Sequence, residues 1–121
     1  MNRLLFIFLF NVFCSLLYAD QASVVLWDPR HQHDHLEYYP PADMPEVYYD
    51  ADNLEIIIVA DGFASYYNVD ITSASGYVPL ISTQIDGYGD SIDVSSLPDG
   101  YYTITISTSN NNEFEGTFAI E

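Results

Sequence analysis

Residues 97–106 have the pattern of a tight turn followed by an alternating strand: Leu97-Pro98-Asp99-Gly100-Tyr101-Tyr102-Thr103-Ile104-Thr105-Ile106. Proline presets φ, aspartate hydrogen-bonds its own backbone and glycine tolerates positive φ, so Pro98-Asp99-Gly100 predicts a turn. From Tyr102 onward every second residue is apolar. This period predicts a strand with one buried face and one solvent-facing face.

A second alternating run follows the first. Asn110-Asn111-Asn112 predicts a turn, and beyond it Phe114, Gly116, Phe118 and Ile120 alternate with other residues. We therefore expect the two runs to pair as an antiparallel C-terminal hairpin. A tyrosine just past a turn glycine, with a leucine upstream, is also how the tyrosine corner of immunoglobulin-like sandwiches is built.

Short runs upstream predict five more strands: Ser23–Trp27, Leu54–Ala60, Tyr66–Ile71, Tyr77–Ile81 and Ile92–Val94. We expect an edge strand for Ser23–Trp27 and a central one for Leu54–Ala60, which is apolar on nearly both faces. Pro79 cannot donate to a ladder, so Tyr77–Ile81 is expected at an edge, with a loop over 86–90 after it. About seven short strands predict an all-β fold, an immunoglobulin-like or fibronectin-III-like antiparallel β-sandwich.

The N-terminus has the pattern of an export signal. Arg3 precedes an apolar run from Leu4 to Leu17, and Ala19 is a small residue at the expected cleavage position. Residues 1–19 thus predict a helical secretory signal peptide and a secreted, periplasmic or cell-envelope location. The run is shorter than the roughly 20 residues of a membrane-spanning helix, so no stable transmembrane span is expected after signal removal. We do not expect lipidation at Cys14, because bulky Phe13 precedes it.

Charge excludes several partners. The chain has eighteen acidic residues and two basic ones, Arg3 and Arg30, for a net charge of −16. Nucleic acid and anionic membrane surfaces are bound through clustered lysine and arginine, so neither is an expected partner. Such a charge favours solubility, cations or a basic partner. Cys14 is the only cysteine, so the mature chain has no disulfide.

Residues 20–52 are expected to form an N-terminal strand and an extended His/Tyr/Pro-rich segment, and residues 53–121 the body of the sandwich. Pro40, Pro41 and Pro45 argue against a helix or a central strand within residues 30–50. His31, His33 and His35 alternate, so an extended chain would place three imidazoles on one side. With a nearby carboxylate they would suit zinc or copper. The alternative is a solvated polar tract, which the same composition fits.

A calcium site is the second metal hypothesis. Asp86, Asp90, Asp93 and Asp99 are interspersed with glycines, and calcium gathers carboxylate oxygens in such loops. The sequence lacks the spacing of a calcium-binding loop, and aspartate with glycine ordinarily makes turns. We therefore predict turn formers here and expect no cofactor, with zinc and calcium as the alternatives.

Exposed tyrosine rings are the candidate ligand surface. The candidates are Tyr38, Tyr39, Tyr48 and Tyr49, with exposure also expected at Tyr66, Tyr88 and Tyr101. These rings would stack on sugars, although tyrosine in a strand is more often part of the sheet. No enzyme is expected: the mature chain lacks Cys, Lys and a Gly-x-Ser-x-Gly nucleophile. A domain of about 100 residues also leaves little room for a catalytic cleft.

Four stretches carry a resemblance to a known family: Asn53–Ile58, Ile92–Val94, Gly100–Ile104 and Phe114–Ile120. Through them, residues 53–121 resemble a family of small exported immunoglobulin-like domains of Bacteroidota, catalogued as a domain of unknown function. Residues 92–102 are also similar to C-terminal secretion-sorting domains of the same bacteria, which follow a large cargo and end in a basic tail. We expect no such cargo here, and the sequence ends in Ala119-Ile120-Glu121 in place of a basic tail.

The resemblance implies an exported sandwich and supplies no activity. We therefore expect a non-catalytic interaction or structural module of the cell envelope, with a protein or glycan partner. The alternative is a metal-binding module that uses His31, His33 and His35, or a carbohydrate-binding module.

Overall fold

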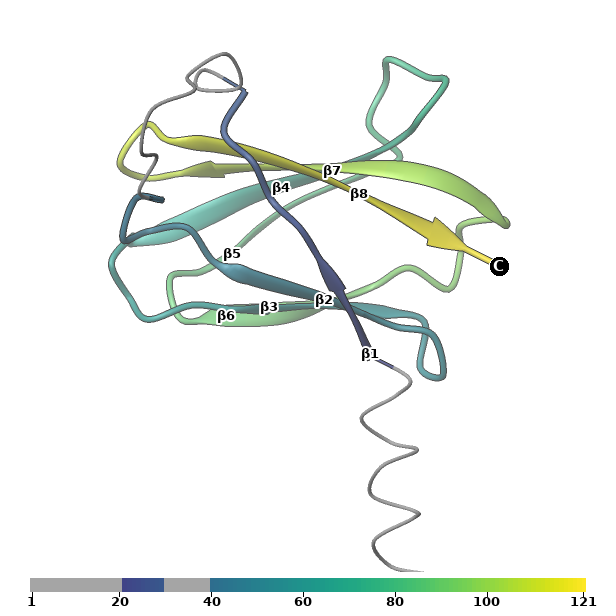
Figure 1. The fold of residues 1–121 in the computed structure, drawn as a ribbon, viewed down its shortest axis with the longest axis horizontal. Helices are drawn as coiled ribbons and strands as arrows, with labels where there is room; N and C mark the ends of the chain where they lie inside the picture. The colour runs from purple at the N-terminus through teal and green to yellow at the C-terminus, as the bar shows by residue number, and fades with distance from the viewer. Residues whose placement is uncertain (1–20, 30–39) are drawn as a thin grey trace, which may run out of the picture.

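Two antiparallel sheets of four strands pack face to face in a computed structural model that describes residues 21–29 and 40–121 (Figure 1). The strands are β1 (Gln21–Val24), β2 (Glu46–Asp50), β3 (Glu55–Val59), β4 (Tyr66–Ser73), β5 (Ile81–Asp86), β6 (Gly89–Asp93), β7 (Gly100–Thr108) and β8 (Glu113–Ile120). The sheet orders are β1-β2-β3-β6 and β5-β4-β7-β8. The predicted all-β sandwich is confirmed, with eight strands among the described residues where about seven were expected.

The C-terminal hairpin is formed as predicted. Strands β7 and β8 pair from Gly100↔Ile120 to Ser107↔Glu113. The alternation buries Tyr102, Ile104 and Ile106 between the sheets. The Tyr102 hydroxyl donates a hydrogen bond to the backbone oxygen of Pro98, four residues upstream. This is the expected tyrosine corner, and it fixes the turn before β7 against the core.

The core lies between the two sheets and is made of the inward positions of each strand. Its fully buried side chains include Val47, Ile56, Tyr67, Val69, Ile71, Val94, Ile104, Ile106 and Phe114. Strands β3 and β4 lie where the sequence predicted, and β3 is internal to its sheet. No helix among the described residues is long and apolar enough to cross a membrane.

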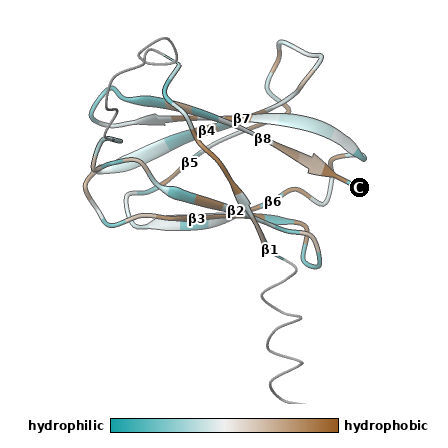
Figure 2. Cartoon of the chain, viewed as in Figure 1, coloured by the Kyte–Doolittle hydropathy of each residue, from teal (hydrophilic) through white to brown (hydrophobic). Residues whose placement is uncertain are grey.

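The N-terminal strap, residues 21–27, contacts both sheets. Strand β1 pairs with β2 at a sheet edge, as predicted, but it ends at Val24 and not at Trp27. Figure 2 shows an apolar stretch after β1. Trp27 and Glu115 of β8 then exchange two backbone hydrogen bonds of 2.8 Å. Gly116 admits this crossing, because a Cβ there would lie 2.9 Å from the Leu26 side chain and 3.0 Å from that of Val24.

The expectation that residues 30–50 contain no central strand is wrong. Strand β2 lies between β1 and β3 and pairs with both. All three prolines precede it, the last at Pro45, so none removes a donor from its ladder. Within β2 the alternating Val47 and Tyr49 face the core.

The strand expected at Tyr77–Ile81 is also displaced. Residues 77–80 form an exposed loop, and β5 begins at Ile81, where the inward positions Ile81 and Ile85 start to alternate. The predicted edge position is confirmed, because β5 pairs only with β4. The loop expected over 86–90 is confined to Gly87 and Tyr88, and β6 begins at Gly89.

Candidate interaction surface

A buried carboxylate holds one end of the sandwich together. Asp43 accepts hydrogen bonds from the Thr108 hydroxyl at 2.6 Å and from the side-chain amide of Asn110 at 3.2 Å. The side-chain amide of Asn112 lies 3.0 Å from each carboxylate oxygen of Asp43. The backbone oxygen of Asp43 accepts a 2.9 Å hydrogen bond from the Tyr67 hydroxyl. The segment before β2 is thereby joined to β4 and to the β7–β8 turn.

Burial raises the pKa of Asp43, but the hydrogen bonds from Thr108, Asn112 and Asn110 lower it by more, so the net pKa lies below the usual value. Burial first, and then the charges of Asp43 and Asp61, raise the pKa of the Tyr67 hydroxyl. The carboxylate therefore stays ionised and the phenol neutral near neutral pH. Both groups serve as fixed hydrogen-bonding partners.

Backbone contacts lock the neighbouring loops to one another. The Asn110 side chain also donates to the Phe63 backbone oxygen at 3.1 Å, and the Ser65 N–H donates to the Ser109 hydroxyl at 2.7 Å. The Gly62 N–H donates to the Gly87 backbone oxygen at 3.0 Å. We call these joined segments the loop end, residues 40–45, 60–66, 86–89 and 108–113. It lies on the left of Figure 1.

Large aromatic side chains are exposed on the loop end. Phe63 is 62% exposed and Tyr88 is 74% exposed. The Tyr88 ring lies against Gly62, where a Cβ would come within 2.8 Å of two ring carbons. Acidic residues are close to both aromatic residues in sequence: Asp61 is two residues before Phe63, and Asp86 accepts a 2.8 Å hydrogen bond from the Tyr88 N–H. We call Phe63 and Tyr88 the aromatic pair.

The structure contradicts the exposure expected for one tyrosine and supports the exposure expected for others. Tyr49 is buried and contacts Phe118 with ring centroids 5.7 Å apart, because it occupies an inward position of β2. The prediction of Tyr49 as a ligand surface is therefore wrong. Tyr48 is partly buried, and its hydroxyl donates to Glu46 at 2.9 Å. That hydrogen bond and the charge of Glu46 raise the pKa of Tyr48.

The exposure predicted for Tyr66, Tyr88 and Tyr101 is confirmed. Tyr38, Tyr39, His31, His33 and His35 lie outside the described residues, as does the predicted signal peptide. The sequence offered no sign of two important positions. Asp43 looked like any loop aspartate, and Phe63 was a single aromatic residue between turn residues.

Two of the four loop aspartates, Asp86 and Asp93, act as turn formers, as predicted, whereas Asp90 lies within β6. Asp86 bonds the N–H of Tyr88, Asp90 that of Ser91 at 2.8 Å, and Asp93 that of Ser95 at 2.9 Å. Hydrogen bonds from Ser95 lower the pKa of Asp93. In residues 21–29 and 40–121, no three His, Cys, Asp or Glu side chains come together in a way that would hold a metal ion.

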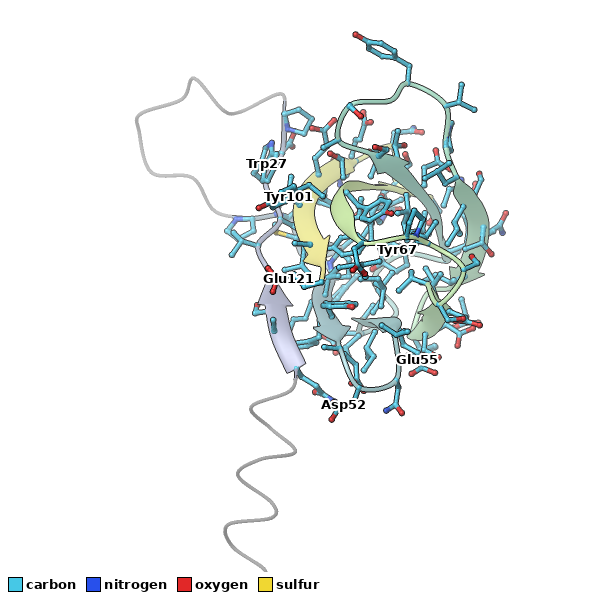
Figure 3. All side chains as sticks on the ribbon, turned by 90° about the vertical axis from the view of Figure 1, so that its right-hand side faces the viewer. Trp27, Asp52, Glu55, Tyr67, Tyr101 and Glu121 are labelled. Carbon is cyan, nitrogen blue, oxygen red and sulfur yellow. The ribbon has the colours of Figure 1, made fainter. Side chains whose placement is uncertain are left out.

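The described part of the chain carries charge of only one sign. Of the eighteen carboxylate residues, three (Asp20, Asp34 and Glu37) lie outside it, which leaves fifteen inside. Every Arg and His lies outside it, and the chain has no Lys. Figure 3 shows Asp52 and Glu55 at the surface of the β1-β2-β3-β6 sheet, in the β2–β3 turn and at the start of β3. These carboxylates therefore find no cationic side chain within the described residues.

No protein-family model matches the chain, and no curated protein matches it. Among solved structures, the chain is similar to a DUF3244 family protein from Bacteroides vulgatus, whose crystal structure has an immunoglobulin-like β-sandwich fold. The TM-score is 0.62 at 14% sequence identity, over 84% of this chain and 99% of that one. This similarity confirms the immunoglobulin-like fold and the structural resemblance to a domain of unknown function.

Proposed function

We propose that this chain is an exported, non-catalytic interaction module of the bacterial cell envelope, and that its loop end binds the partner. One observation carries the proposal: the aromatic pair, Phe63 and Tyr88, is largely exposed on loops that are already joined by hydrogen bonds, of which the one from Thr108 to Asp43 is buried. Aromatic side chains dominate the energetics of binding sites. Loops that are already held in one conformation lose less conformational entropy on binding.

The partner favoured by the surface is a basic segment of another protein. Each aromatic residue has an acidic residue two positions before it, Asp61 before Phe63 and Asp86 before Tyr88, and the described residues contain no cationic side chain that would compete for these carboxylates. An arginine or lysine side chain gains from an aromatic face and from a nearby carboxylate. The long-range field of an acidic domain also accelerates encounter with a basic partner.

A catalytic role finds little support at the loop end. A general acid or base works best with a pKa near the operating pH. Asp43 and Tyr67 are the groups with shifted pKa values here, and their shifts run away from neutrality, downward for the acid and upward for the phenol. Each is also held by hydrogen bonds that a reaction would have to break.

The proposal that the chain is exported depends on its sequence. The pattern of residues 1–19 supports secretion, and the absence of disulfides leaves stability to the apolar core and the buried hydrogen bonds. A protein partner in the same compartment is then within reach.

A carbohydrate partner is the second candidate, because exposed planar rings beside carboxylate and amide groups also suit sugar rings. Salt distinguishes the two candidates. Binding of a basic peptide weakens steeply as ionic strength rises, whereas binding of a neutral glycan does not.

Two tyrosines of equal exposure give a matched test. Tyr88 lies on the loop end and Tyr101 at the start of β7, and both are 74% exposed. Fluorescence anisotropy with a labelled peptide of alternating arginine and glycine should show binding that Phe63→Ala/Tyr88→Ala abolishes and Tyr101→Ala retains. Equal binding by all three proteins would show unspecific charge attraction and contradict the proposal. Binding of neutral glycans on an array, lost only in Phe63→Ala/Tyr88→Ala, would establish the carbohydrate candidate.

A further inference from the structure

The edge strands of this sandwich differ in how they are protected from pairing with a strand of another chain. The described residues leave four strands at sheet edges: β1, β6, β5 and β8. Natural edges are kept from pairing with other chains by shortness, charge, proline, bulges or coverage. Strand β1 has four residues, Trp27 bridges the outer side of β8, and β6 carries Asp90 and Asp93.

Within residues 21–29 and 40–121, strand β5 has none of these devices along its length. Its six residues, Ile81-Ser82-Thr83-Gln84-Ile85-Asp86, contain no proline, and their one charge is at the last position. Its register with β4 runs without a bulge from Tyr66↔Asp86 to Ile71↔Ile81. Half of its backbone donors and acceptors point away from β4 in such a pairing. These groups form a ready template for another strand.

An exposed apolar loop stands directly before this edge. Tyr77, Val78 and Leu80 are 98%, 76% and 54% exposed. The Leu80 N–H donates to the Ile71 backbone oxygen at 2.8 Å, so the chain already follows β4 before β5 begins. At the other side of the loop, the Ala74 N–H donates to the Tyr101 backbone oxygen at 3.0 Å. Figure 1 shows this β4–β5 loop rising above the sheet at the end away from the loop end.

We propose that β5 accepts an extended basic segment of another protein as a fifth strand of the β5-β4-β7-β8 sheet, with an apolar side chain of that segment packed against Tyr77, Val78 and Leu80. Strand addition draws affinity from main-chain hydrogen bonds and specificity from alternate side chains. Contiguous exposed apolar side chains commonly mark such contact sites.

The acidic residues near β5 favour a basic segment as the added strand. Asp86 occupies an outward position at the end of β5, and Asp70 occupies one on the adjacent β4, where its carboxylate accepts a 2.6 Å hydrogen bond from the Ser82 hydroxyl of β5. A basic strand would place its outward side chains next to them. A second copy of the chain fits poorly, since each copy carries a net charge of −16 and none of its described residues is basic.

The test uses the full chain without residues 1–19 and an eight-residue peptide of alternating valine and arginine. Hydrogen exchange measured by NMR should show slowed exchange of β5 amides when the peptide is added. A matched peptide of valine and glutamate should protect nothing. A third peptide, N-methylated at alternate amides, should bind at least severalfold more weakly, because it cannot complete the ladder. Absence of β5 protection at millimolar basic peptide would overturn the proposal.

Protein variants separate this edge from the loop end. Tyr77→Ser/Val78→Ser/Leu80→Ser replaces only exposed side chains and should weaken β5 protection severalfold, whereas Tyr101→Ser should not. Phe63→Ala/Tyr88→Ala should leave β5 protection unchanged even if it abolishes binding at the loop end. Protection of β5 in the protein alone, with a dimer in analytical ultracentrifugation, would show that a second copy occupies the edge and would refute the basic partner.

Discussion

The Thr108 hydroxyl donates a 2.6 Å hydrogen bond to the Asp43 carboxylate across 65 residues of sequence. The same hydroxyl oxygen accepts hydrogen bonds from the backbone N–H groups of Asn110 and Asn112, at 3.1 Å and 3.3 Å. One hydroxyl thus shapes the β7–β8 turn and ties it to the segment that enters β2. The two sheets of the sandwich are joined at this point by polar contacts.

Asp43→Asn should destabilise the domain by about 2–3 kcal/mol, because the new amide would face the amide donors of Asn110 and Asn112 where a charged acceptor stood. Urea unfolding monitored by tyrosine fluorescence measures the change. Asp61→Asn, at an exposed carboxylate, is the matched control and should stay within about 0.5 kcal/mol of the parent. Equal effects of the two substitutions would show that the buried contacts add nothing.

Acid should weaken the same contacts. The pKa values of Asp43, Asp50 and Asp93 are lowered in the folded state, so the unfolded chain binds protons more readily than the folded one. Their contribution to stability is full above the unfolded pKa of aspartate, about 3.9, and is lost as the pH falls through the lower folded values. Acid also relieves the repulsion among the carboxylates, so the test is the difference between two proteins: between pH 5 and pH 2 the urea midpoint of the parent should fall relative to that of Asp43→Asn, which lacks the Asp43 contribution.

Salt should stabilise the domain. The described residues have fifteen carboxylates and no cationic side chain, so screening relieves repulsion among them without weakening an ion pair between two described residues. Between ionic strengths of about 0.01 M and 1 M the Debye length falls from about 30 Å to about 3 Å. We expect a gain on the order of 1 kcal/mol, or about 4–8 °C in Tm. A Tm that falls as sodium chloride is added would refute this.

Tyr102→Phe should cost about 1 kcal/mol of unfolding free energy, because the backbone oxygen of Pro98 loses its donor while the ring stays packed. The adjacent Tyr101→Phe supplies the control, since that side chain is exposed and should be neutral. Thermal unfolding of the two variants side by side makes the comparison. A Tyr102→Phe variant with the same unfolding free energy as the parent would mean that ring packing alone holds the tyrosine corner.

The histidine tract stays a sequence-based prediction, with its own test. If His31, His33 and His35 bind zinc only in the folded protein, zinc at 100 times its Kd should add about 2.7 kcal/mol to stability. The Tm of metal-stripped protein should then rise with zinc and stop responding in the His31→Ala/His33→Ala/His35→Ala variant. A zinc response that survives the triple substitution would place the metal elsewhere, and no response would reject the site.

Local patterns predicted the parts of the fold that depend on neighbours in sequence. The hairpin and the tyrosine corner follow from a turn and a period of two around Tyr102, and β3 and β4 follow from similar alternation. The sequence prediction failed where a local feature was compatible with two structures, a strand and a loop. Proline at Pro45 excluded a strand only before β2, and apolar Tyr77–Leu80 resembled a strand although it stays exposed.

The candidate site was harder to predict because its contacts are distant in sequence. The partners of the Asp43 carboxylate lie 65 to 69 residues away, and nothing in the residues around it indicates burial. Tyr88 was expected to be exposed, but its position against Gly62 depends on the contact between two loops from different strand pairs. Phe63 gains its importance from that same contact.

The N-terminal strap has a consequence for proteolysis. Arg30 is the only arginine in residues 21–121, and no lysine is present, so a trypsin-like protease has a single site there, between β1 and β2. A cut after Arg30 would leave β1 without a covalent link to the rest of the chain and held by its pairing with β2 and by the Trp27 bridge to β8. The nicked protein would be a two-piece complex whose short piece is exchangeable for a synthetic peptide that carries the sequence of residues 20–30.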